Sequence, residues 1–132
     1  MIEELSYEII EAIVDMLPVE ISFVEKDDTV RYFNKEGRRI FPRSRAIIGR
    51  KVQNCHPKKS VHIVNKILDD FRNKKRDSAE FWINLKGRKV YIRYFAVRDA
   101  EGSYLGCLEV TQDITDIQKI KGEKRLPENQ SS

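Results

Sequence analysis

Three aromatic-rich segments restrict the fold of this chain more than any other feature. They cover residues 78–85, 89–97 and 103–111 and hold Phe81, Trp82, Tyr91, Tyr94, Phe95 and Tyr104. Runs of aromatic and β-branched residues bounded by turn signals are typical of β-strands. Only short turns at residues 86–87 and 98–102 separate the segments, so neighbouring strands have to run antiparallel. The sequence therefore predicts a three-stranded antiparallel meander.

In two earlier segments, residues 19–24 and 29–33, apolar and polar residues alternate on either side of a Glu-Lys-Asp-Asp turn. This pattern predicts a β-hairpin. Short pieces interrupted by glycine and proline follow over residues 34–58 and are too short for more than a few helical turns. Five antiparallel strands with helices on one face form an α+β architecture, and we expect a pocket between the sheet and those helices.

Helices are predicted from apolar residues that recur at intervals of three and four. One amphipathic helix covers residues 3–17 and stops before Pro18. Its apolar face is broad, so it has to cover either the domain's own sheet or a second copy of the chain. A longer helix runs through residue 72 with Ser60 as its expected N-cap. Another helix is expected to begin after the last strand, near residue 113.

Size and composition favour one cytoplasmic domain. A length of 132 residues suits a single core. No apolar run approaches the roughly 20 residues that a membrane span needs, and the acidic start of the chain argues against a secretory leader. Two cysteines are too few for a disulfide framework.

Charge is unevenly distributed along the chain. Residues 35–76 hold fourteen lysines and arginines against three acids. Such a block suits a solvated helical face, or else an acidic partner. The strand aromatics interleave with Arg88, Arg93 and Arg98, a pattern that could also stack single-stranded nucleic acid. Strand aromatics are more commonly core residues, so we do not expect a nucleic-acid partner.

The segment "YLGCLEVTQDITD" resembles the end of a PAS domain, in which a glycine in the fifth strand precedes Asp-Ile-Thr. The resemblance covers residues 18–116, with residues 1–17 as a flanking helix and residues 117–132 as the start of a signalling helix and a disordered tail. More narrowly, the chain resembles the PAS module at the C-terminus of prokaryotic hemerythrin-like proteins. If that match holds, the iron-binding bundle is absent and the chain is either a fragment or a stand-alone relative.

The resemblance implies a sensory signal-transduction module and not an enzyme. Such modules hold a haem, a flavin or a small metabolite between sheet and helices, form homodimers through flanking helices and act on a protein partner or a fused effector domain. The signalling residues would be Asp113, Ile114 and Thr115. Asp113 would pair with Arg93 or Arg98 on a neighbouring strand, and Thr115 would cap the outgoing helix.

Candidate ligand-binding residues gather in the stretch "NCHPKKSVH". His62 lies where the resemblance places the proximal histidine of haem-binding PAS sensors, so a haem-based gas or redox sensor is one alternative. A metal site is conceivable only with strained geometry, because Cys55 and His56 are adjacent in sequence. A dimerisation module whose pocket is filled by its own side chains is the other alternative. The ligand itself is not identified by the sequence, and the candidate binding residues are Cys55, His56, His62, Tyr94 and Cys107.

Overall fold

The computed structural model describes residues 1–127, and they form a five-stranded antiparallel sheet in the order β2-β1-β5-β4-β3. All five predicted strands are present, with ends that differ from the prediction by at most two residues. They are β1 (Glu20–Glu25), β2 (Val30–Phe33), β3 (Ser78–Leu85), β4 (Arg88–Arg98) and β5 (Tyr104–Asp113). The predicted α+β PAS fold is therefore confirmed.

The β3–β4 hairpin shows how the sequence sets the register of the sheet. Leu85 pairs with Arg88, so the turn between them has two residues. Lys86 and Gly87 both have positive φ, 51° and 79°, as a two-residue turn between right-twisted strands requires. This register places Phe81 opposite Ile92 on the inner face of the sheet and Trp82 opposite Tyr91 on the outer face.

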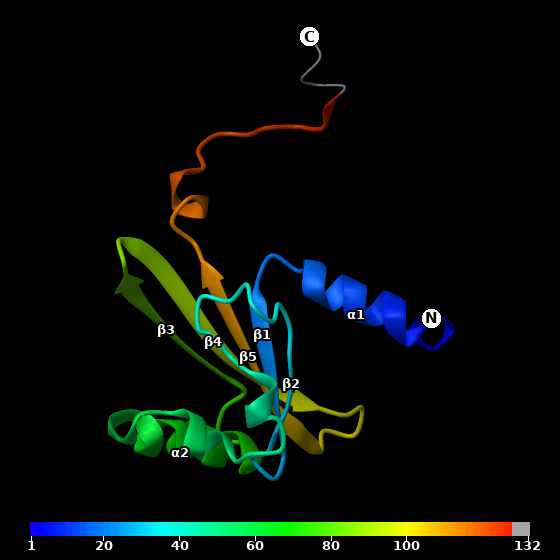
Figure 1. The fold of residues 1–132 in the computed structure, drawn as a ribbon, viewed down its shortest axis with the longest axis vertical. Coiled ribbons are helices and arrows are strands. Elements are labelled where there is room, and N and C mark those ends of the chain that lie inside the picture. Colours follow the sequence, from blue (N-terminus) through cyan, green and yellow to red (C-terminus); the bar gives the residue numbers. More distant parts are fainter. Residues whose placement is uncertain (128–132) are drawn as a thin grey trace.

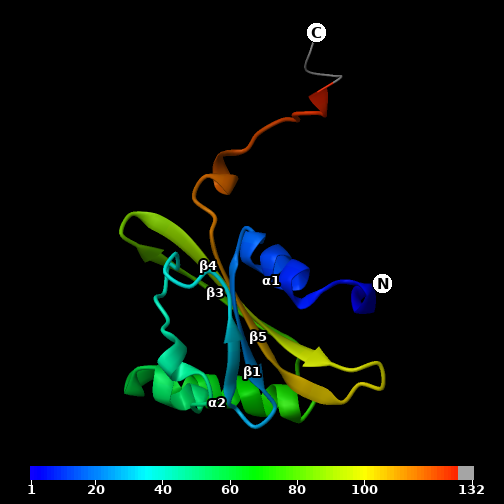
Figure 2. The same cartoon turned by 45° about the vertical axis from the view of Figure 1, so that its right-hand side comes forward.

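Helix α2 (Lys58–Arg72) lies across the lower part of the sheet in Figures 1 and 2 and provides one wall of the core. Its Val64, Ile67, Leu68 and Phe71 pack in one cluster with Val24, Tyr94 and Cys107 of the strands. The predicted N-cap at Ser60 is wrong: the helix starts at Lys58 after Pro57, and Ser60 donates its hydroxyl hydrogen to the Pro57 carbonyl oxygen, 3.1 Å away.

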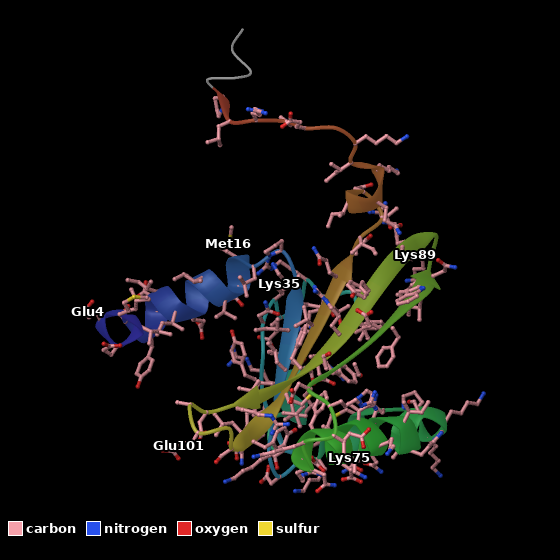
Figure 3. All side chains as sticks on the ribbon, turned by 180° about the vertical axis from the view of Figure 1, so that it is seen from behind. Glu4, Met16, Lys35, Lys75, Lys89 and Glu101 are labelled. Carbon is pink, nitrogen blue, oxygen red and sulfur yellow. The ribbon has the colours of Figure 1, made fainter. Side chains whose placement is uncertain are left out.

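Helix α1 (Tyr7–Met16) stands away from the sheet, with its N-terminal end furthest out (Figures 1 and 2). Ser6 caps it by accepting a hydrogen bond from the Ile9 amide at 3.2 Å. None of its residues is buried. Figure 3 shows Met16 at the end near Lys35 and Glu4 at the distant end. The domain's own sheet therefore leaves the apolar face of α1 uncovered.

The chain after β5 differs from the predicted signalling helix. It forms one turn of 3-10 helix at Ile117–Lys119, and the backbone through residue 126 is otherwise irregular. The predicted disordered tail falls largely on residues 128–132, which lie outside the described residues.

Candidate functional site

Polar side chains face the core side of the sheet where its three central strands meet. Glu109 of β5 lies directly opposite Ser22 of β1 and Tyr94 of β4. Because directly paired residues point to the same face, all three side chains lie on the inner face, as Cys107 does two residues earlier. Segment 34–57, which joins β2 to α2, covers this part of the face.

An ion pair holds segment 34–57 against the sheet. Arg39 and Glu20 lie 3.4 Å apart, and both side chains are almost fully buried. The Glu20 carboxylate also accepts hydrogen bonds from the Ile40 and Phe41 amides at 2.6 and 3.1 Å. Arg39 donates to the carbonyl oxygens of Ile21, Asn34 and Phe41. Because both charges are compensated, we assign this pair a structural role.

Next to this pair lie polar groups without such partners. The His56 Nε2 atom is 3.9 Å from the Glu109 Oε1 atom, which is too long for a hydrogen bond. His56 Nε2 and Arg43 Nε are buried and have no hydrogen-bond partner among the described residues. The side chains of His56 and Glu109 are only 15% and 11% exposed. We call Arg43, His56, Tyr94, Cys107 and Glu109 the Glu109 cluster.

Burial controls protonation in the Glu109 cluster. It raises the pKa of Glu109 although Arg43 and Arg39 act in the opposite direction, so the neutral acid is favoured. Burial and the Arg43 charge both lower the pKa of His56, which favours the neutral imidazole. Burial and the Glu109 charge raise the pKa of both Tyr94 and Cys107, which keeps the phenol and the thiol protonated. The cluster thus presents mainly neutral hydrogen-bonding groups beside the Arg43 guanidinium.

The structure brings together three of the five candidate binding residues, namely His56, Tyr94 and Cys107. Cys55 is half-buried and packs against the core beside them. His62 is exposed on α2, on the side opposite Val64 and Leu68. A haem on His62 would therefore lie outside the core, so the residues present do not fit a buried haem. Among the described residues, no group of His, Cys, Asp and Glu is suited to a metal ion.

Sequence reasoning missed Glu109 and Arg43. The signal for Glu109 was available in the segment "YLGCLEVT", because alternation puts it on the same face as Cys107. An acid in the middle of a strand on a buried face is rare and marks a polar site. Arg43 gave no comparable signal, since its irregular segment has no periodicity that would define a face.

The Asp113-Ile114-Thr115 segment joins the end of β5 to the start of β4. Asp113 pairs with Arg88 at 2.7 Å, so the predicted partners Arg93 and Arg98 were wrong. Hydrogen bonds to Arg88 and Thr115 lower the pKa of Asp113 to about 2. Thr115 Oγ1 accepts from the Lys89 amide at 2.7 Å and caps no helix. These contacts fasten the end of β5 and the residues after it to the start of β4.

An open groove of about 660 Å³ lies between α1 and β2. Its walls carry acids of α1, Glu11 and Asp15, and several bases of β2 and the segment after it. Those bases are Arg31, Lys35, Arg38 and Arg45.

Comparison with known protein families shows the family to which the chain belongs. A family model described as "PAS domain" matches residues 10–115. The chain is a PAS domain. Members of this family are in general sensory signalling modules and not enzymes. No helix among residues 1–127 of this PAS domain combines the length and the apolar character of a membrane span.

Solved structures agree with this assignment. The chain is similar to a C-terminal domain from Streptococcus mutans, with 38% identity, a TM-score of 0.82, and coverage of 89% of this chain and 91% of that one. The PAS domain of Bordetella pertussis BvgS is 18% identical with a TM-score of 0.62, covering 85% and 88%. A sensory box sensor histidine kinase from Vibrio cholerae is 15% identical with a TM-score of 0.57, covering 82% and 90%. The structures from Bordetella pertussis and Vibrio cholerae support the PAS fold alone. A search of curated proteins found no match to this chain.

Proposed function

We propose that this PAS domain is a cytoplasmic sensory module that binds a small ligand at the Glu109 cluster. The observation that carries the proposal is the pair of buried nitrogen atoms without partners, His56 Nε2 and Arg43 Nε, facing a buried acid. Leaving a buried polar group unpaired costs about 1–3 kcal/mol, and a ligand that pairs with these atoms recovers that cost. The similar structures include a sensor histidine kinase from Vibrio cholerae, which supports the sensory assignment and a fused effector or protein partner.

Signal transfer is proposed to follow β5. Glu109 and Asp113 lie on the same strand, four residues apart and on the same face. A ligand that moves Glu109 displaces β5 against β4, and the Asp113–Arg88 pair and the Thr115–Lys89 hydrogen bond pass this displacement to the outgoing chain.

Native mass spectrometry tests ligand binding, with a matched pair of histidine variants. The chain is purified without denaturation and incubated with small molecules extracted from the cells that express it. We expect an adduct that is lost in His56→Leu, which removes a buried polar group of the site, and kept in His62→Leu, which alters the exposed face of α2. The same adduct in both variants, or none in the wild type, would contradict the proposal. A haem adduct lost only in His62→Leu would establish the alternative gas or redox sensor.

We further propose that the domain forms a homodimer through α1. Ile9, Ile13 and Met16 of this helix are exposed, and a contiguous apolar patch is unusual for a free surface. The groove beside it carries both signs of charge, because its four bases face the acids Glu11, Asp15 and Glu36. The proposal therefore rests on the exposed apolar side chains of α1, which the same helix of a second copy would cover in a symmetric interface.

Light scattering after size exclusion tests the dimer. Ile9 and Ile63 are both 48% exposed, on α1 and α2 respectively. We expect Ile9→Glu to weaken dimerisation about 30-fold, because a symmetric dimer loses the apolar burial twice. Ile63→Glu introduces the same charge elsewhere and should leave the dimer intact. A wild-type monomer at all concentrations, or equal effects of the two variants, would refute this interface. A dimer that binds no ligand would favour the pure dimerisation module.

A further inference from the structure

The charges around the Glu109 cluster do not balance. Arg39 is neutralised by Glu20 at 3.4 Å, and both side chains have their hydrogen bonds made. Arg43 has no ion pair and no hydrogen bond among residues 1–127, and its Nε atom is buried. Its one acidic neighbour in the cluster, Glu109, is held toward the neutral form by burial. A single positive charge therefore remains uncompensated at this site.

We propose that the Glu109 cluster binds a small monocarboxylic acid, with Arg43 as its counter-charge and His56 as a second hydrogen-bonding partner. The inference rests on the proposed ligand-binding function and names the chemical class of the ligand.

A carboxylate fits these groups better than other anions do. A monoanion compensates the one free charge, whereas a phosphate monoester would bring close to two charges into a buried site and leave one without a partner. Arg43 Nε and His56 Nε2 both lack a partner, and a carboxylate offers one acceptor oxygen for each. Hydrogen bonds between an ionised donor and a carboxylate are roughly twice as strong as neutral ones.

The surroundings set the size and polarity of the rest of the ligand. Tyr94 and Cys107 of the cluster adjoin Ile92 and Phe81 on the same face of the sheet. Phe81 meets Tyr94 edge to face, with ring centroids 5.3 Å apart. An apolar body beside the acid group would therefore match these neighbours. Arg43 and His56 both lie in segment 34–57, which has only short helical turns.

Titration followed by ¹H–¹⁵N NMR of the full chain tests the ligand class. The probes are benzoate and butyrate, each compared with its neutral amide, benzamide or butyramide. We expect a carboxylate to shift the amide signals of His56, Tyr94 and Glu109, and to bind at least about tenfold more tightly than its amide.

Two arginine variants decide whether Arg43 supplies the charge. Arg43→Met keeps the length of the side chain and should weaken carboxylate binding about tenfold while leaving the amide unaffected. Arg45→Met is the control, because Arg45 is 85% exposed and pairs with Glu36 outside the cluster. Equal binding of acid and amide, unchanged binding in Arg43→Met, tighter binding of inorganic phosphate, or no shift at the cluster with either acid would each overturn the inference. A His56-dependent adduct in native mass spectrometry would then still support ligand binding.

Discussion

Replacing Gly106 with alanine is expected to destabilise the domain by about 3 kcal/mol, near the upper end of the usual cost of overpacking. A Cβ atom at this position would lie 2.3 Å from the Val24 carbonyl oxygen and 2.6 Å from the Phe23 Cζ atom. The first of these is a backbone atom of β1, so no change of rotamer relieves the contact. Because β5 lies between β1 and β4, it cannot move away from one without disturbing the other.

Thermal unfolding followed by circular dichroism measures this effect, and Gly37→Ala is the control. Gly37 has a positive φ of 80°, but a Cβ there would meet nothing within 4 Å. Its replacement costs only the backbone strain, about 1–2 kcal/mol. We expect the midpoint of thermal unfolding to fall by about 10 °C for Gly106→Ala and clearly less for the control. An equal fall of the midpoint in the two variants would contradict this prediction, because it would show that β1 and β5 can move apart to accommodate the added Cβ atom.

The fold was predictable from sequence because local pattern and sheet geometry agree. The two-residue Lys86-Gly87 turn sets one register for β3 and β4, and that register decides which of their residues share a face. Gly106 also belonged to the recognised pattern, and the structure supplies its physical reason, the contact with β1.

The site was less predictable because it depends on pairs that are distant in sequence. Asp113 meets Arg88 and not Arg93, since the pairing of Val90 with Asp113 brings Arg88 to the strand end. The approach of His56 to Glu109 depends on how an irregular segment folds over the sheet, and no periodicity describes that path. The position of α1 likewise does not follow from its amphipathic pattern. The pattern indicates that one face of the helix packs against another surface, but it does not identify that surface.

The position of α1 depends on Asn34, which is 1% exposed at the end of β2. Its side-chain oxygen accepts from the Ile21 amide at 2.7 Å, and its side-chain nitrogen donates to the carbonyl oxygens of Val14 and Val19 at 2.9 and 3.1 Å. One amide group thus joins the end of α1, the linker and the start of β1. In Figure 3 this junction lies near the labelled Met16 and Lys35, where α1 meets the sheet.

Asn34→Ala is expected to lower the free energy of unfolding by about 3 kcal/mol, because the Ile21 amide and the Val19 carbonyl lose a partner at a cost of about 1–3 kcal/mol each, whereas the Val14 carbonyl keeps the Leu17 amide. Urea unfolding measures the loss, with Asn84→Ala on the exposed side of β3 as a control that should change stability little. A loss below about 1 kcal/mol would mean that water replaces the amide at this junction. If Asn34 sets the direction of α1, Asn34→Ala also weakens the proposed dimer under conditions where the variant remains folded. The reason is that the apolar face of α1 no longer has a fixed orientation toward a second copy.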